Sequence, residues 1–270
     1  MILEAGASSF AIDWTLVQQS IARANRVCSY DRAGHGWSDP PGPVSDVTRD
    51  LRALLTTAGE KPPYVLVGAS MGGLYVRLYA AQYPNDVAGF VLVDPASEER
   101  LFTYYNGEAV TITSLTAEQY RSVIQPGTIS VPRRSPQTGA PFDRLPKPLY
   151  DTRIKLDERL IASYPSTVTY ETRIAAGETE RARLALLRDM TMKNAQPLGN
   201  RPIVVLTRGV DAAQGVRDVH AALARLSSSS RHTVVANAGH EIHLFEPAAV
   251  IQAIADVIEA IQSNKPLPPR

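Results

Sequence analysis

The chain has 270 residues, of which 44% are hydrophobic and 20% are charged, an ordinary composition for one globular domain with an insertion. Its 28 Lys and Arg residues balance 27 Asp and Glu residues, so the net charge of +1 gives no electrostatic reason to expect a nucleic acid as partner. A single cysteine, Cys28, excludes an internal disulfide and favours a reducing compartment, so we expect a cytoplasmic protein. No apolar run is long enough to cross a bilayer, and we expect no membrane partner.

Short apolar runs alternate with helical patterns along most of the chain, which is typical of an α/β protein with a mostly parallel sheet covered on both faces. Helices are predicted over 47–58, 74–83 and 250–261, and Ser45 is the predicted cap of the first. The predicted strands are Met1–Glu4, Arg26–Tyr30, Tyr64–Val67, Gly89–Val93, Ile203–Leu206 and Thr233–Ala236.

The alternation of strands and helices stops between Ser97 and about Asn200. A Pro-rich loop, Gln125–Pro148, is followed there by helical stretches such as Glu178–Met192. Loops at the carboxyl ends of parallel strands surround the ligand site, so an insertion of this length is expected to be functional. We therefore predict a core formed by residues 1–96 and 201–270 and an inserted cap, or lid, formed by 97–200.

A serine stands directly after an apolar strand and before a helical run in YVLVGASMGG. Gly68, Ser70 and Gly72 fit the pattern G-x-S-x-G, in which the glycines permit close approach of strand and helix and the serine lies in a strained turn that exposes its hydroxyl. The same segment fits neither the dinucleotide pattern G-x-G-x-x-G nor the phosphate loop that ends in Gly-Lys-Ser/Thr. We predict that Ser70 is a nucleophile.

A serine nucleophile needs a histidine to accept its proton. His240 follows the last predicted strand and precedes the final helix, whereas His35 lies in an early loop, His220 in a helix and His232 at the start of a strand. His243 forms an H-x-x-H pair with His240, but no further ligand of suitable spacing follows, so we interpret it as a packed loop residue and expect no metal. His240 is the predicted base.

A carboxylate must orient that histidine, and two strand ends offer one. Asp211 follows the apolar run Ile203–Leu206 in LTRGVD and is the first choice. Asp94 ends the preceding strand in VLVDP, and its carboxylate is the alternative acid.

Taken together, LEAG, SYDRAGHGWSD, GASMGG, VLVDP and AGHEIHL resemble the α/β-hydrolase superfamily, in the branch of serine esterases and proline iminopeptidases. The order Ser70, Asp211, His240 is the order that this fold uses. The resemblance implies that Asp31, Arg32 and the loop that follows them brace the turn beside the active site. It also implies an oxyanion hole formed by the backbone N–H groups of Met71 and Ala7, in a loop that reads Ala5-Gly6 where many relatives have His-Gly.

Relatives of this kind carry two antiparallel strands before the strand that ends in the oxyanion loop, whereas here that strand begins at Met1. We therefore expect about six strands, with Arg26–Tyr30 on an open edge that pairs with a second copy in a homodimer. The alternative is a truncated start of the chain.

A carboxylesterase that acts on a small-molecule ester through an acyl-enzyme, without a cofactor, is the function these motifs favour. A proline-iminopeptidase-like aminopeptidase is the first alternative, and it requires a pair of cap carboxylates to bind a free amine. A non-catalytic, hydrolase-like binding protein is the second, and the presence of a full candidate triad argues against it.

Overall fold

The computed structural model of the protein describes residues 1–42, 46–100 and 102–267. Its centre is a six-stranded sheet in the order β2-β1-β3-β4-β9-β10, in which every neighbouring pair is parallel. The predicted α/β class and all six predicted strand regions are confirmed, although the second strand is shorter than expected. The strands are β1 (Ile2–Glu4), β2 (Cys28–Ser29), β3 (Tyr64–Ala69), β4 (Val87–Val93), β9 (Ile203–Arg208) and β10 (Ser230–Val235).

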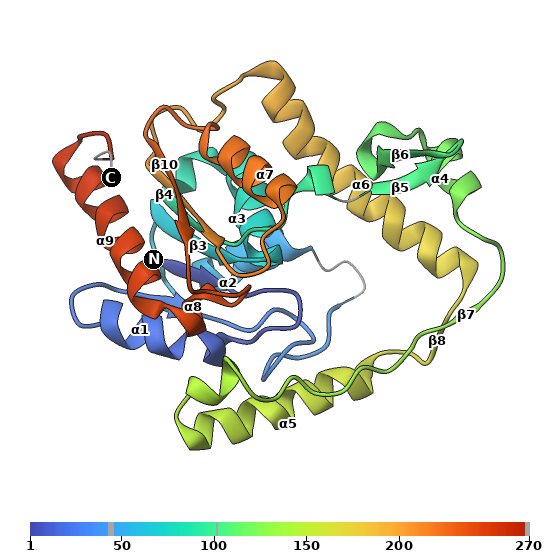
Figure 1. The fold of residues 1–270 in the computed structure, drawn as a ribbon, viewed down its shortest axis with the longest axis horizontal. Helices are drawn as coiled ribbons and strands as arrows, with labels where there is room; N and C mark the ends of the chain where they lie inside the picture. Colours follow the sequence, from blue (N-terminus) through green and yellow to red (C-terminus); the bar gives the residue numbers. More distant parts are fainter. Residues whose placement is uncertain (43–45, 101, 268–270) are drawn as a thin grey trace.

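Helices cover both faces of this sheet (Figure 1). Successive strand residues point to opposite faces, so Val91 packs in the core beneath α1 and α9, whereas Leu92 packs in the core beneath α2, α3 and α7. Both faces are apolar, as expected for a buried parallel sheet. The helices are α1 (Thr15–Ile21), α2 (Val47–Thr57), α3 (Met71–Gln82), α7 (Gln214–Ala224), α8 (Ile242–Phe245) and α9 (Pro247–Ser263).

Helix α2 begins at Val47, as the sequence predicted, but the residue that caps it is Asp46. The Asp46 carboxylate accepts hydrogen bonds from the backbone N–H groups of Thr48 and Arg49. Ser45, the predicted cap, lies outside the described residues.

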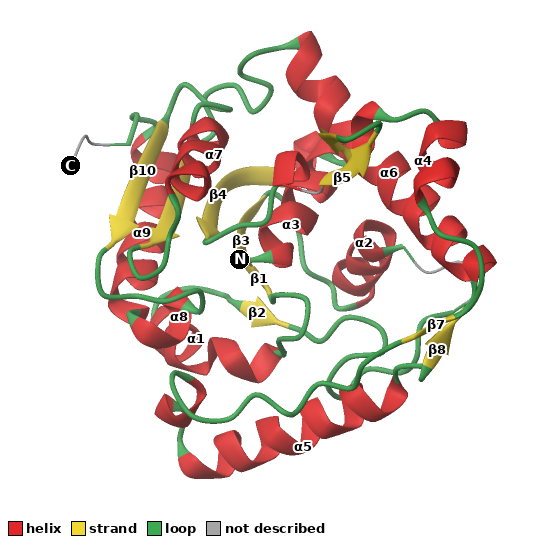
Figure 2. Ribbon diagram, turned by 45° about the vertical axis from the view of Figure 1, so that its right-hand side comes forward, coloured by secondary structure: helices red, strands yellow, loops and turns green. Residues whose placement is uncertain are grey.

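The segment between β4 and β9 lies outside the six-stranded sheet (Figures 1 and 2). Its helix α6 packs on α3 through Leu184 and Leu187, which contact Leu74 and Leu78. Its helix α5 is joined to the core by a buried ion pair, in which Arg153 Nε donates to Asp13 Oδ1 at 2.8 Å. The elements of this segment are the hairpin β5 (Phe102–Tyr105) and β6 (Glu108–Thr111), the pair β7 (Ile129–Ser130) and β8 (Thr167–Val168), and the helices α4 (Ala117–Val123), α5 (Lys147–Ser163) and α6 (Tyr170–Lys193).

Short 3-10 helices complete the described secondary structure. One of them, η1, follows the loop after β1 and carries Asp13. They are η1 (Ala11–Trp14), η2 (Pro84–Asp86), η3 (Glu98–Arg100), η4 (Ile112–Ser114) and η5 (Phe142–Arg144). Across the described ranges, no helix is both long enough and apolar enough to span a membrane.

Strand β2 forms one edge of the sheet, which confirms the predicted edge within the described residues. Its apolar neighbours are only partly available for a partner, because Val27, Cys28 and Tyr30 pack partly against the two cores. The side chain of Arg26 pairs with Glu60. The edge therefore offers a partner chain mainly the backbone of a short strand, and little apolar surface.

We propose that two copies pair through this edge into a symmetric dimer. Sedimentation velocity at micromolar concentration should then give twice the mass of one chain, and hydrogen exchange should slow across residues 26–30. A strictly monomeric protein, or a dimer whose protected segment spares these residues, contradicts the proposal.

The start of α3 lies so close to the end of β1 that a side chain does not fit between them. A Cβ at Gly72 would lie 2.3 Å from the Glu4 carbonyl oxygen and 2.7 Å from that of Ala5. We expect Gly72→Ala to lower the free energy of unfolding by about 2 kcal/mol or more, because backbone atoms must move. Gly215→Ala in α7 is the control, since nothing lies within 4 Å of its Cβ, and it should leave urea denaturation unchanged or shifted to higher urea. Equal effects of the two substitutions contradict this explanation.

Candidate active site

Ser70 stands at the junction of β3 and α3 in a conformation that is rare for a residue with a side chain. Its φ is 51° and its ψ is −121°. Its backbone N–H donates to the Val93 carbonyl at 3.0 Å, and its carbonyl accepts from Gly73 and Ala96 at 3.0 and 2.8 Å. A Cβ at Gly68 would lie 2.5 Å from the Gly72 carbonyl. Hydrogen bonds to β4 and α3 therefore hold the turn in place. Glycine is needed at position 68 because a Cβ there would overlap the backbone of α3.

His240 lies between β10 and α8 and is bound to a buried carboxylate. Its Nδ1 hydrogen-bonds Asp94 Oδ2 at 2.5 Å. Asp94 follows β4, the strand next to the one that carries Ser70. The Asp94 side chain is 1% exposed and that of His240 is 43% exposed. The histidine thus has one ring nitrogen anchored in the protein while much of the ring reaches solvent.

Asp211, the first-choice acid, does not occupy this position. The carboxylate at His240 Nδ1 is that of Asp94, the alternative, and Asp211 is exposed in the turn after β9. That turn lies tightly on the end of β10: a Cβ at Gly209 would lie 2.3 Å from the Ala236 carbonyl, and Val210 N–H donates to Ala238. The geometry therefore favours Asp94, the alternative acid, over Asp211, because the carboxylate that contacts His240 Nδ1 is that of Asp94.

Arg208 also holds the Asp94 carboxylate. Its backbone N–H donates to Oδ1 at 3.1 Å, and its guanidinium donates to Oδ2 and lies 3.1 Å from His240 Nδ1. Burial alone would raise the pKa of Asp94, but the hydrogen bond from His240, that from the Arg208 backbone and the two positive charges lower it. The hydrogen bond to Asp94 raises the pKa of His240, against burial and the Arg208 charge. Asp94 is therefore ionised, and it favours a protonated His240.

A second polar chain supports the segment that follows Asp94. His220 Nε2 lies 2.8 Å from the Pro95 carbonyl, which can only accept, so a neutral His220 donates from this nitrogen. Its Nδ1 then accepts from Thr207 Oγ1 at 2.7 Å, and the same hydroxyl accepts from His232 Nε2 at 2.7 Å. These two histidines are thus explained as partners within the fold.

The loop after β1 lies against the serine. A Cβ at Gly6 would lie 3.4 Å from Ser70 Cβ. Met71 is the first residue of α3, where backbone N–H groups have no partner inside the helix. Ala7 follows in the β1 loop, and its carbonyl accepts from His35 Nε2 at 2.9 Å. The segments that carry both predicted oxyanion donors therefore flank Ser70.

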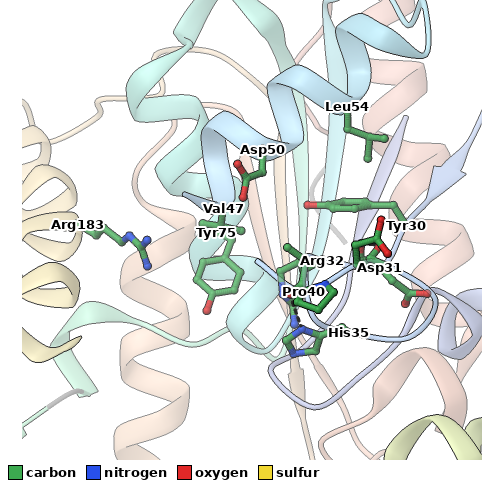
Figure 3. Close-up of a pocket in the computed structure, with 13 residues that line it drawn as sticks. Tyr30, Asp31, Arg32, His35, Pro40, Val47, Asp50, Leu54, Tyr75 and Arg183 are labelled. Carbon is green, nitrogen blue, oxygen red and sulfur yellow. Dashed lines mark hydrogen bonds between the residues drawn. The ribbon is translucent and has the colours of Figure 1, made fainter. Parts of the chain in front are cut away.

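Hydrogen bonds of Asp31 connect the loop DRAGHGWSD internally and to the start of η1. Asp31 accepts hydrogen bonds from the backbone N–H groups of Ala11 at 2.8 Å and Trp37 at 3.2 Å, and Ser38 Oγ donates to the Asp31 carbonyl at 2.6 Å. Gly36 has a φ of 50°, and a Cβ there would overlap the Asp31 carboxylate. A cavity of about 430 Å³ opens beside this loop, and Tyr30, Arg32, His35, Tyr75 and Arg183 contribute to its wall (Figure 3).

His243 is a packed residue, as interpreted from the sequence, but it lies in helix α8 and not in a loop. It is buried, and its ring lies 4.6 Å from that of Trp14. Burial lowers its pKa to about 3, so it stays neutral. Among the residues that the structure describes, no group of three His, Cys, Asp or Glu side chains is arranged to hold a metal ion.

The sequence reading missed Arg208 and Glu4. Glu4 ends the apolar strand β1 and is buried with Arg32. Both residues are ionisable side chains at the end of an apolar strand, and a charge placed there needs a partner of opposite charge. The need for an opposite charge predicts that each residue has a partner, but it does not identify the partner, because the paired residues are distant in sequence.

A model of the alpha/beta hydrolase family matches residues 2–253 of this chain. The chain belongs to this family. The match covers the strand that precedes the oxyanion loop, the Ser70 turn, the Asp94–His240 pair and the first part of α9, so it includes every segment of the candidate site.

Two curated relatives match nearly the whole chain, and a third matches a shorter part of it. The uncharacterized protein YqjL of Bacillus subtilis is 25% identical over 99% of this chain and 87% of its own length. Monoacylglycerol lipase ABHD6 of Mus musculus is 26% identical over 96% of this chain and 75% of its own. The probable transporter efuK of Hormonema carpetanum is 34% identical, but over 38% of this chain and 16% of its own.

Solved structures share the fold. An esterase from Thermogutta terrifontis has a TM-score of 0.61 and 21% identity, covering 96% of this chain and 89% of that one. The esterase RhEst1 from Rhodococcus has a TM-score of 0.58 and 20% identity, covering 96% and 90%. The chain is therefore a hydrolase-fold protein with esterases among its structural neighbours.

The contact with Asp94 leads us to predict how the pKa of His240 is shifted. Its pKa should lie above the ordinary 6.5, and Asp94→Asn should lower it, because an amide carries no charge to stabilise the imidazolium. Protonated His240 then stabilises the fold fully below pH 6.5, and this contribution is lost as the pH rises through the folded-state pKa. NMR titration of the ring protons, with Asp211→Asn as control, measures the shift. A His240 pKa that responds to Asp211→Asn and not to Asp94→Asn contradicts the geometry.

Proposed function

We propose that this protein is a carboxylesterase that cleaves small-molecule esters through an acyl-enzyme on Ser70. The observation that carries the proposal is the buried Asp94 bound to His240 at the end of β4, directly beside the strand whose strained turn presents Ser70. A nucleophile, a base and a carboxylate that orients the base are the parts that acyl transfer requires. The esterases and the lipase among the relatives support the same reaction class.

Each residue then has one role in the reaction. Asp94 occupies His240 Nδ1, which leaves Nε2 to accept the proton of the Ser70 hydroxyl as its oxygen bonds to the ester carbonyl carbon. The backbone N–H groups of Ala7 and Met71 stabilise the resulting oxyanion. His240 returns the proton to the leaving alkoxide, and a water molecule activated by the same nitrogen releases the acid. The reaction needs neither a metal nor an organic cofactor.

The aminopeptidase alternative receives less support from the inserted segment. It requires carboxylates that bind a free amine, but Glu178 pairs with Arg121 at 2.6 Å and Glu180 lies 3.7 Å from Arg183. Acidic side chains already paired with arginines are poorly suited to a second cation. A binding protein without catalysis remains the second alternative, and the first experiment below tests it directly.

We further propose that residues 97–200 act as the cap and determine substrate range. The core delivers the nucleophile, the base and the oxyanion donors, whereas α6 of the insertion contributes Arg183 to the cavity beside the loop that carries Asp31 and Arg32. Within the insertion, Leu145 and Leu149 pack with Leu244, whereas Tyr104 is largely exposed. Exposed residues of the insertion are therefore the better positions at which to alter specificity.

Ser70→Ala and His240→Ala should each remove esterase activity by several orders of magnitude while leaving the fold intact, because members of a triad act as a unit. The assay is hydrolysis of p-nitrophenyl esters of increasing chain length, with prolyl-p-nitroanilide included. Near wild-type turnover by the Ser70 variant would contradict the proposed acyl-enzyme mechanism. Turnover of the anilide alone favours the aminopeptidase, and a folded wild type without any turnover favours the binding protein.

Asp94→Asn and Asp211→Asn form a matched pair, since both remove one charge from a turn after a strand. Asp94→Asn should lower kcat by about 10³–10⁴-fold, because it disturbs the orientation and tautomer of His240. Asp211→Asn should change kcat by less than about twofold, as expected for an exposed side chain. The opposite ranking returns the acid's role to Asp211.

A further inference from the structure

Arg32 holds the backbone of the loop that follows β1. Its Nη1 donates to the Ala5 carbonyl at 2.7 Å, and its Nη2 donates to the Gly6 carbonyl. The same Nη2 lies 3.4 Å from the Ala7 carbonyl. One guanidinium thus reaches three consecutive carbonyl oxygens.

The guanidinium is itself fixed in place. Its Nη1 pairs with Glu4 Oε1 at 2.5 Å, and the other Glu4 oxygen accepts the hydroxyl of Tyr30. The Glu4 side chain is 1% exposed and that of Arg32 is 10% exposed, and the guanidinium also lies over the ring of Tyr75 at 5.4 Å. Figure 3 shows Arg32 between Tyr30 and Tyr75 at the wall of the cavity.

This contact, together with a hydrogen bond from the Ser9 backbone N–H to the same Gly6 oxygen at 3.3 Å, fixes the direction of one N–H group. In a trans peptide the C=O of Gly6 and the N–H of Ala7 belong to one plane and point in opposite directions. With the Gly6 oxygen bound to Arg32, the Ala7 N–H is directed away from the guanidinium, and Gly6 itself lies against Ser70. A hydrogen bond from His35 Nε2 to the Ala7 carbonyl fixes the next peptide in the same way.

We propose that Arg32 is a positioning residue of the oxyanion hole: it orients the Gly6–Ala7 peptide so that the Ala7 N–H meets the oxyanion formed at Ser70. The proposal rests on the esterase function proposed above. It gives Arg32 a role beyond bracing its own turn, because the carbonyls it binds belong to another loop. Arginine is required because its planar fork has several N–H donors at fixed angles, whereas lysine carries one compact charge.

The test is Arg32→Lys, which keeps the charge beside Glu4 and removes the fork. We expect kcat to fall about 10- to 100-fold, which does not exceed the fall in kcat caused by removing a whole oxyanion donor. KM should change by less than about threefold. The second readout is the affinity for phenylboronic acid. Ser70 Oγ bonds to its boron, the hydroxyl proton passes to His240, and the tetrahedral boronate places an oxygen in the oxyanion hole. This affinity, measured by calorimetry, should fall in parallel with kcat.

Arg231→Lys is the matched control. The Arg231 side chain is also 10% exposed and pairs with a carboxylate, Asp256, that is 3% exposed. It lies on β10 and should leave kcat and boronate affinity unchanged. If Arg32→Lys fails to fold, Glu4→Gln provides the second variant, because it loosens the guanidinium without removing it and should lower kcat in the same direction by a smaller factor.

The outcomes separate the two proposals. If the wild type is active and Arg32→Lys leaves kcat and boronate affinity unchanged, the role of Arg32 is overturned and the esterase proposal stands. The same holds for Glu4→Gln where that variant is needed. A fall in kcat with unchanged boronate affinity, or an equal fall in Arg231→Lys, assigns Arg32 to stability and also overturns it. A folded wild type that neither hydrolyses esters nor binds the boronate removes the esterase proposal and this one together.

Discussion

The close packing of β3 against the first turn of α3 is the constraint on which the candidate site depends. Gly68 and Gly72 leave no room for a Cβ, and the chain can turn from strand to helix only with Ser70 in its strained conformation. The same contact brings the first turn of α3 onto the end of β1, so the serine and the loop after β1 are placed by one interaction. Backbone packing, rather than hydrogen bonding of the serine side chain, fixes the nucleophile.

Two buried carboxylates organise the site on either side of this turn. Asp94 binds Arg208 and His240, and Glu4 binds Arg32, so each carboxylate is joined to a guanidinium that also contacts a candidate catalytic segment. A buried charge without its partner is costly, which makes these contacts specific even where their net contribution to stability is small. Burial raises the pKa of Glu4 although Arg32 and Tyr30 oppose it, whereas the bonds at Asp94 outweigh burial and keep that carboxylate ionised.

The features predicted correctly from the sequence are those that depend on a local pattern of residues. Apolar runs placed the six strands, and Ser70 and His240 followed from their positions after strands. The sequence put Asp211 before Asp94, whereas the contact with His240 is made by Asp94, because the contact joins segments 146 residues apart and no local pattern encodes it. Glu4, Arg32 and Arg208 were missed or assigned to the scaffold for a related reason, since their roles arise from partners up to 114 residues away.

The inserted segment is attached to the same parts of the core that carry the candidate chemistry. Helix α6 packs on α3, which begins directly after Ser70, through Leu184 and Leu187. Helix α5 is tied by Arg153 to Asp13 in η1, which follows the loop of the proposed oxyanion donor. Burial raises the pKa of Asp13 to about 6 even with Arg153 beside it, so this anchor is a full ion pair only above that pH. The insertion therefore bears on the nucleophile and on the oxyanion loop through separate contacts, one apolar and one ionic.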